Sequence, residues 1–167
     1  EALHGAHAAA RFPGLSGAAQ VDDWSQLVAG KDDLVATLRQ KKYADLLPHY
    51  NGVDYIDEGP ATLIEGGVQV GDRKITASKT LIATGSRTLV PEIRGIEQVD
   101  PLDSKSLLEL ETLPDSLIFI GAGYIGAELA QMMARMGVKV TMVARSRLLP
   151  GAEPEVSDAL TEAFEAE

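Results

Sequence analysis

The amino-acid sequence predicts the α/β class, with parts of two doubly wound domains and a small β-meander in the first. Two observations indicate the second domain. The apolar run 117–120 leads directly into a glycine-rich turn, 121–126, and a helical pattern and another apolar run, 138–143, follow it. A strand, glycine-rich turn, helix and strand in this order begin a doubly wound sheet. A third observation, short runs between glycine-containing turns over 53–77, is typical of a β-meander.

The composition excludes several classes of protein. The chain has 167 residues, of which 45% are hydrophobic and 24% charged, as in ordinary globular proteins. Its net charge of −10 argues against a nucleic-acid or anionic-membrane surface, because such surfaces need clustered lysine and arginine. The absence of cysteine excludes disulfides, thiolate metal sites and cysteine nucleophiles within the chain. The apolar runs are shorter than the roughly 20 residues that cross a bilayer, so no transmembrane helix is expected.

The two ends of the chain favour an internal piece of a longer, cytoplasmic protein. Residue 1 is Glu rather than Met, and no signal peptide is visible. Glu167 falls inside a helical pattern that no stop signal closes. The alanine-rich residues 1–10 are expected to finish a helix, which Pro13 and Gly14 break.

A long amphipathic helix is expected over 24–46. Apolar residues recur there at helical spacing, Asp22 and Asp23 offer an N-cap, and Pro48 ends the pattern. We expect the apolar stripe to cover a core, since burial is the usual role of such a face. A surface for a binding partner is the alternative.

Shorter elements follow this helix. The β-meander is expected over 53–77, and a further strand over 79–83 ends at Thr84. An extended linker over 88–112 contains Pro91, Gly95 and Pro101 and includes a short helix or turn from residue 107.

The second domain begins near Pro114. Its strands, 117–120 and 138–143, are continuous apolar runs that predict burial on both faces of a parallel sheet. The helix between them is expected over 128–136, with Gly137 ending it. Another helix opens at Pro154.

The glycine-rich turn is in the context that dinucleotide binding requires. Gly121 permits a tight turn, Gly123 lets backbone N–H groups approach a pyrophosphate, and Gly126 lets the helix pack closely on the strand. The helix N-terminus then offers N–H donors and a positive dipole end to the phosphates. The alternative is a glycine-rich turn without a ligand.

The end of the second strand indicates which nucleotide is bound. An acid at this point binds the ribose 2′-hydroxyl of NAD, whereas arginine suits the 2′-phosphate of NADP. The chain has Arg145, Ser146 and Arg147 there, and no acid before Glu153. NADPH is therefore favoured, because one guanidinium group can donate two parallel hydrogen bonds to two oxygens of a phosphate. A glycine rather than alanine at position 126 weakly favours NADH, and two solvated arginines are the alternative reading.

Several motifs in order resemble the flavoprotein pyridine nucleotide–disulfide oxidoreductases. They are the run Leu-Ile-Ala-Thr-Gly-Ser at 81–86, Leu-Pro at 113–114 and Gly-Ala-Gly-Tyr-Ile-Gly-Ala-Glu at 121–128. Within that family, residues 41–43, 90–96 and 144–146 are most similar to the NADPH-linked branch that reduces Hg²⁺. The NAD-linked branch that oxidises dihydrolipoyl groups is the alternative.

The resemblance implies an FAD domain with an inserted NAD(P)H domain, in a protein that forms a homodimer. Residues 1–112 would be an incomplete FAD-binding domain and 113–167 an incomplete, Rossmann-like NAD(P)H-binding domain. Tyr124 would lie near the nicotinamide pocket, and Glu128 would pair with a lysine near the flavin. The cofactor-binding residues that the resemblance and the motifs together imply are Ala61, Ala83, Thr84, Gly85, Gly121, Gly123, Tyr124, Ile125, Gly126, Glu128, Arg145 and Arg147.

Ordinary structural roles are the alternatives for two of these residues. Tyr124 is also suited to be a half-buried packing residue, and Glu128 to be an acid that the helix dipole favours.

The resemblance places the family's catalytic groups outside this chain. The redox-active cysteine pair, the first FAD-binding glycine motif and the acid/base histidine have no counterpart here, so no catalytic residue is expected within it. His4 and His7 have helical spacing, but two residues do not complete a metal site, and none is expected. A second hypothesis is therefore that the chain alone is a non-catalytic nucleotide-binding piece with an incomplete core.

Overall fold

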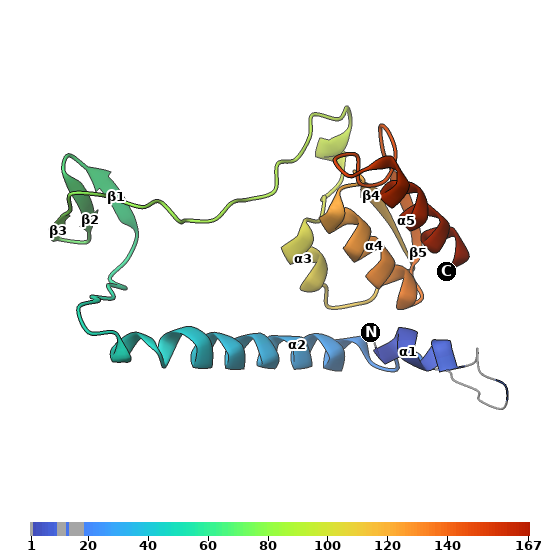
Figure 1. The fold of residues 1–167 in the computed structure, drawn as a ribbon, viewed down its shortest axis with the longest axis horizontal. Coiled ribbons are helices and arrows are strands. Elements are labelled where there is room, and N and C mark those ends of the chain that lie inside the picture. Colours follow the sequence, from blue (N-terminus) through green and yellow to red (C-terminus); the bar gives the residue numbers. More distant parts are fainter. Residues whose placement is uncertain (1, 10–12, 14–18) are drawn as a thin grey trace. The chain divides into compact units, whose positions relative to one another are not determined.

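A computed structural model describes residues 2–9, 13 and 19–167 (Figure 1). The chain divides into two compact units, one of residues 1–30 with 92–167 and the other of residues 31–91. The first is called the larger unit below and the second the smaller unit. The expected division into domains at residue 112 stays a prediction.

The larger unit is built on two parallel strands. Strands β4 (Ser116–Ile120) and β5 (Lys139–Val143) pair along their whole length, and helix α4 (Tyr124–Arg135) connects them. Gly137, with φ of 92°, follows α4 and ends it as expected. Helix α5 (Pro154–Ala166) begins at the predicted proline. The predicted α/β class and its doubly wound beginning are confirmed, although α4 begins at Tyr124 rather than near Glu128.

The core of the larger unit lies between α4 and the sheet. Met133 of α4 is fully buried and packs with Leu107 and Val138. The Trp24 indole N–H donates to the Leu110 carbonyl at 2.7 Å, which fastens the start of α2 (Trp24–Arg39) to this core. The partly buried residues that complete the core are Trp24, Leu110, Leu113, Leu117, Phe119, Leu129, Met132, Met136 and Val140.

The prediction that both strands are buried on both faces is wrong for this chain. Burial alternates along β4 and β5, so that one face packs on α4 and the other is exposed. The exposed fraction is 69% for Ile118 and 52% for Val143. Burial on both faces requires a second covering layer, and no element of the described residues supplies one.

The long helix is present, but its apolar stripe is not buried. Helix α2 continues as a π-helical turn, η1 (Gln40–Ala44), and a 3₁₀ turn, η2 (Leu47–His49), follows near Pro48. No described residue of α2 is buried, and Leu34 is 58% exposed. The expected burial fails because no other described helix or strand packs extensively on α2.

The smaller unit contains the predicted β-meander. Strands β1 (Ala61–Ile64), β2 (Gly67–Val70) and β3 (Arg73–Thr76) pair antiparallel in sequence order. Gly67 is required for this packing, because a Cβ there would lie 1.9 Å from the Ile75 carbonyl oxygen.

Two predicted runs are not strands. Residues 53–58 and 79–83 form no ladder with any described strand. The sequence 79–83 is apolar enough for a buried strand, but a strand is stable only where a neighbour accepts its backbone hydrogen bonds.

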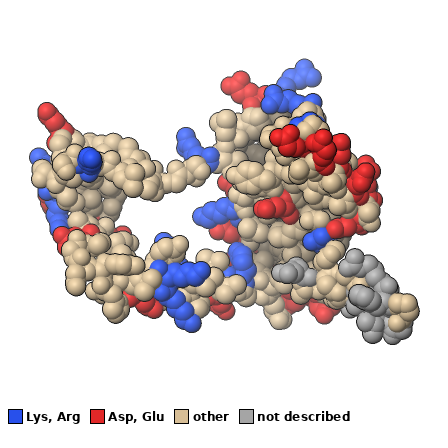
Figure 2. All heavy atoms as spheres, viewed as in Figure 1, with Lys and Arg blue, Asp and Glu red and all other residues tan. Residues whose placement is uncertain are grey.

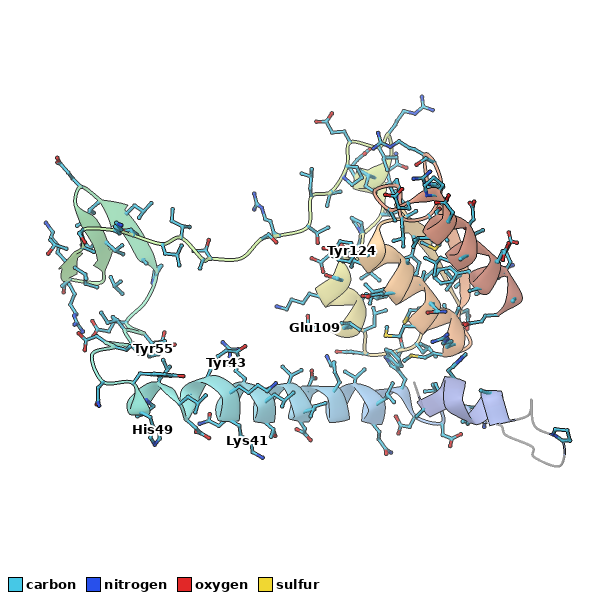
Figure 3. All side chains as sticks on the ribbon, in the orientation of Figure 1. Lys41, Tyr43, His49, Tyr55, Glu109 and Tyr124 are labelled. Carbon is cyan, nitrogen blue, oxygen red and sulfur yellow. The ribbon has the colours of Figure 1, made fainter. Side chains whose placement is uncertain are left out.

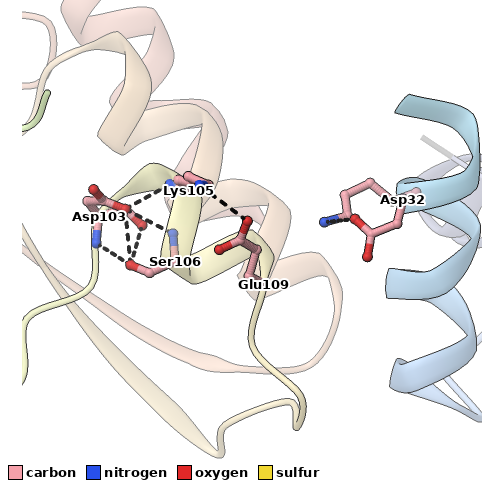
Figure 4. Close-up of polar contacts among 6 residues, drawn as sticks. Asp32, Asp103, Lys105, Ser106 and Glu109 are labelled. Atoms are coloured by element: carbon pink, nitrogen blue, oxygen red, sulfur yellow. Dashed lines mark hydrogen bonds and ion pairs between the residues drawn. The ribbon is translucent and has the colours of Figure 1, made fainter. Parts of the chain in front are cut away.

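The linker contains two short helical elements, η3 (Ile96–Gln98) and α3 (Ser104–Leu108). Asp103 caps α3 in a capping box, in which its carboxylate accepts from the N–H groups of Lys105 and Ser106 (Figure 4). The Ser106 hydroxyl in turn accepts from the Asp103 N–H at 2.8 Å. No helix in the described part of the chain is long and apolar enough to cross a membrane.

The capping box generates a pH prediction. Hydrogen bonds from the backbone and hydroxyl of Ser106, with a smaller one from Lys105, lower the pKa of the Asp103 carboxyl. A carboxyl whose pKa is lower in the folded state stabilises the protein above its unfolded pKa, about 3.9, and loses this effect as pH falls through the folded pKa. We therefore expect Asp103→Ala to destabilise α3 at pH 7. At a pH below the folded pKa of Asp103, the part of this difference that depends on the charged carboxylate should be lost.

Urea unfolding at a series of pH values, followed by circular dichroism, measures the difference. Asp103→Asn is the matched control, because an asparagine caps the helix without titrating. A wild type and alanine variant that differ equally at every pH would contradict the assignment.

Candidate functional site

The carboxyl ends of β4 and β5 form one edge of the sheet, and a pocket of about 410 Å³ lies there. The Gly121 N–H donates to the Val143 carbonyl at 2.8 Å, which continues the strand pairing into the turn. The glycine-rich turn and the segment after β5 therefore meet, as the sequence indicated. The pocket is lined by Gly121, Ala122, Ala144, Arg145, Ser146, Arg147 and Pro150.

The turn has the backbone geometry that its glycines suggested. Gly121 has φ of 111°, in the region that L side chains rarely adopt. A Cβ at Gly126 would lie 3.4 Å from the Gly121 carbonyl oxygen, so the helix passes close to the turn. Open space surrounds Gly123, where a Cβ would meet nothing within 4 Å.

Helix α4 begins at this turn without a side-chain cap. Gly123 is its N-cap, and a glycine offers no side chain to accept from the first helical N–H groups. Those groups have no partner within the helix, and the positive end of the helix dipole lies with them. The uncapped N-terminus and the open face of Gly123 fit the pyrophosphate of a dinucleotide.

The two arginines of the pocket have different surroundings. Arg145 is exposed and makes no hydrogen bond or ion pair with any other residue that the structure describes. Arg147 is also exposed, but its Nη2 donates to the Ala152 carbonyl at 2.7 Å. The guanidinium of Arg145 is thus available to an anion, whereas that of Arg147 is already bonded to a carbonyl of the same loop.

The segment 144–153, called the arginine loop below, is fastened at several points. The Leu149 N–H donates to the Ala122 carbonyl at 2.7 Å, and Leu149 has a left-handed φ of 46°. On the other side, the Ser157 hydroxyl of α5 donates to the Leu148 carbonyl at 2.6 Å. Sequence reasoning missed both contacts, since neither Leu149 nor Ser157 belongs to a recognisable motif.

The residues after Gly123 lie on the first turns of α4. Tyr124 is 69% exposed and projects from the helix (Figure 3), and Ile125 is also exposed. Glu128 is exposed and follows Tyr124 at helical spacing, so both belong to one face. The alternative role of Tyr124, as a half-buried packing residue, is therefore wrong for this chain.

The expected flavin contacts belong to the smaller unit. Ala61 begins β1, and Ala83, Thr84 and Gly85 lie in the irregular segment after β3. Gly85 has φ of 77°, which suits glycine. The shared role of these residues at FAD stays a prediction.

The described residues contain no group of three or more histidine, cysteine or acidic side chains that could hold a metal ion. His4 lies on α1 (Ala2–Ala9), and the side chain of His7 lies outside the described residues.

Comparison with known proteins gives one family for the whole chain. The sequence profile of the pyridine nucleotide-disulphide oxidoreductases matches residues 6–167. A mercuric reductase of Streptomyces lividans is 42% identical over 173 aligned positions, which cover all of this chain and 36% of that protein. A mercuric reductase of Staphylococcus aureus is 45% identical over 155 positions, or 92% of this chain and 28% of that one.

A solved structure is similar over the same extent. The Cu(II) complex of the HOCl-induced flavoprotein disulfide reductase RclA from Escherichia coli matches with a TM-score of 0.74 and 32% identity. The match covers 98% of this chain and 35% of that chain. The chain therefore spans about a third of the length of these proteins.

The geometry of the glycine-rich turn makes a stability prediction. Gly121→Ala places a Cβ in a strained conformation, which costs about 1–3 kcal/mol of unfolding free energy. Gly126→Ala is the matched control, because Gly126 has no left-handed φ and its Cβ would make only a van der Waals contact at 3.4 Å, while alanine favours a helix by about 0.5–1 kcal/mol over glycine. Urea unfolding of the two variants compares them, and an equal or smaller loss in Gly121→Ala would contradict the strain at Gly121.

Proposed function

Because the chain belongs to the pyridine nucleotide-disulphide oxidoreductases, we propose that its larger unit binds NADPH in a complete protein that is an FAD-dependent mercury(II) reductase. The mercuric reductases at 42% and 45% identity support the choice of branch. The sequence likenesses at 41–43, 90–96 and 144–146 support the same branch.

One observation carries the choice of nucleotide: the pocket beside the glycine-rich turn is lined by Arg145, whose guanidinium has no polar partner among the described residues. The 2′-phosphate is the group that distinguishes NADPH from NADH, and arginine binds phosphate strongly. No acid precedes Glu153 in the arginine loop, so no carboxylate is available there for the 2′-hydroxyl of NADH. Acidic side chains gather over α5 (Figure 2), so a local cation is needed to hold a phosphate in this region.

The roles of the chain's own residues follow from this arrangement. The N–H groups at the start of α4 bind the pyrophosphate, and Gly123 allows its close approach. Arg145 holds the 2′-phosphate, while Tyr124 covers the nicotinamide and Glu128 pairs with a lysine of the complete protein. When bound, NADPH would supply the hydride for reduction of the flavin, and the disulfide that receives the electrons would lie in other parts of the protein. Because this chain has no cysteine, the dithiol that reduces the substrate Hg²⁺ lies in other parts of the protein.

Two alternatives make different predictions. The NAD-linked dihydrolipoyl branch shares the motifs but prefers NADH, and a cysteine pair that binds mercury would be missing from its complete protein. A disulfide reductase like RclA, which is 32% identical in structure comparison, would act on another substrate. In every case we propose a cytoplasmic homodimer. The coding sequence on both sides of this chain separates these branches by its cysteines.

We predict that the 167-residue chain alone has no reductase activity. It contains no thiol to accept electrons, and the exposed face of β4 and β5 leaves its core incomplete. NADPH oxidation with Hg²⁺ is assayed in the isolated chain and in the complete protein. Activity in the isolated chain would contradict the prediction.

The second prediction concerns Arg145 in the complete protein. Arg145→Glu replaces an attraction by a repulsion, and a charge-assisted pair is worth roughly 1.5–3 kcal/mol, or about 10- to 150-fold in affinity. The KM for NADPH should rise by about that factor, and NADH should bind no worse. Arg147→Ala should lose less, because Arg147 already donates to the Ala152 carbonyl.

Measurement of kcat/KM with both nucleotides gives the result. Equal losses for NADPH and NADH in Arg145→Glu would indicate a folding defect and remove the support for a specificity contact. An unchanged NADPH preference would mean that both arginines are solvated, and NADPH would have no support in this loop.

A further inference from the structure

We propose that Ser157 is the positioning residue of the nucleotide site: its hydroxyl holds the arginine loop in the shape that directs Arg145 to the 2′-phosphate. The inference rests on the proposed function, since it names what sets the preference for NADPH. Ser157 itself lies on α5, outside the residues that line the pocket.

Ser157 is buried where α5 meets the half-buried residues Leu148 and Leu149 of the arginine loop. Its exposed fraction is 0%, and it is the single polar or charged residue that is buried among those the structure describes. Its hydroxyl donates to the Leu148 carbonyl at 2.6 Å. A buried hydroxyl is costly unless it is paired, so this bond fixes both α5 and the loop at the point where they meet.

The bond belongs to a chain of contacts that ends at the glycine-rich turn. Next to Leu148, the Leu149 N–H donates to the Ala122 carbonyl at 2.7 Å. The Leu149 carbonyl accepts from the Ala152 N–H at 2.8 Å, and Arg147 donates to the Ala152 carbonyl. The loop is thus tied to the turn on one side and to α5 on the other.

Leu149 shows that the loop needs these ties. It is the one non-glycine residue with positive φ among the described residues, at 46°. A left-handed conformation is unfavourable for a residue other than glycine, so surrounding contacts must hold it. The hydroxyl of Ser157 acts on the residue immediately before it.

Arg145 depends on the backbone of the loop. Its side chain makes no polar contact with any described residue, so the course of the loop sets the position of its Cα and thereby the region that the guanidinium can reach. Removal of the Ser157 hydroxyl changes no residue that lines the pocket, but it leaves the Leu148 carbonyl without the hydroxyl that donates to it. The expected consequence is a loop with more conformations, of which a fraction directs Arg145 correctly.

The experiment compares two probes on the complete, FAD-loaded protein. Adenosine 2′,5′-bisphosphate contains the 2′-phosphate, and adenosine 5′-monophosphate lacks it. Loss of one net hydrogen bond corresponds to about 2- to 12-fold in affinity. Calorimetry should show that Ser157→Ala weakens the bisphosphate by about this factor and leaves the monophosphate unchanged, while the KM for NADPH rises and kcat does not fall.

Thr161→Val is the matched control. Thr161 also lies on α5, but its hydroxyl donates to the Ser157 carbonyl of its own helix at 2.9 Å and makes no bond to the loop. Its removal should leave the preference for the bisphosphate intact. Ser157→Cys, which keeps the size with a weak S–H donor, should be intermediate and serves if the alanine variant does not fold. An equal effect of Thr161→Val and Ser157→Ala would overturn the proposal.

A double variant separates this inference from the proposed function. If Ser157 acts through Arg145, then Arg145→Ala with Ser157→Ala binds the bisphosphate no more weakly than Arg145→Ala alone. Additive losses would overturn the positioning role and leave the role of Arg145 standing. If Arg145→Ala alone leaves the preference for the bisphosphate unchanged, the proposed function and this inference both fail.

Discussion

The parallel pairing of β4 with β5 is the constraint on which the rest of the structure depends. Ser116 pairs with Lys139 and Ile120 with Val143, so the two strands end at the same edge. The chain must therefore turn at Gly121 beside the point where β5 releases residue 144, and the bond from Gly121 to Val143 extends the pairing into that turn. A shift of register would separate the turn from the arginines.

The residues at this edge of the sheet have two different roles. Leu149 and Arg147 hold the arginine loop in place: the Leu149 N–H donates to the Ala122 carbonyl of the turn, and Arg147 donates to the Ala152 carbonyl of the loop. Arg145 is different, because no residue in the described part of the chain makes a hydrogen bond or ion pair with its guanidinium. Because hydrogen bonds already hold the backbone of the loop, an anion that binds Arg145 would have to order the side chain but not the loop.

Local pattern predicted the part of the fold that local interactions determine. The apolar run, the three glycines and the following helix are close in sequence, and the structure places them as expected. The strand expected at 79–83 and the burial of α2 failed because each depends on a partner distant in sequence. The sequence also could not predict that Arg145 and Arg147 have different surroundings, because the difference comes from a hydrogen bond between Arg147 and the Ala152 carbonyl.

We propose above that this edge of the sheet binds the adenosine half of NADPH. A crystal structure of the complete protein with NADP⁺ tests it most directly. We expect the pyrophosphate at the N–H groups that begin α4, the 2′-phosphate within hydrogen-bond distance of Arg145, and the hydrogen bond from Ser157 to Leu148 intact. A nucleotide bound away from the glycine-rich turn, or a 2′-phosphate in solvent beyond the reach of Arg145, would contradict it.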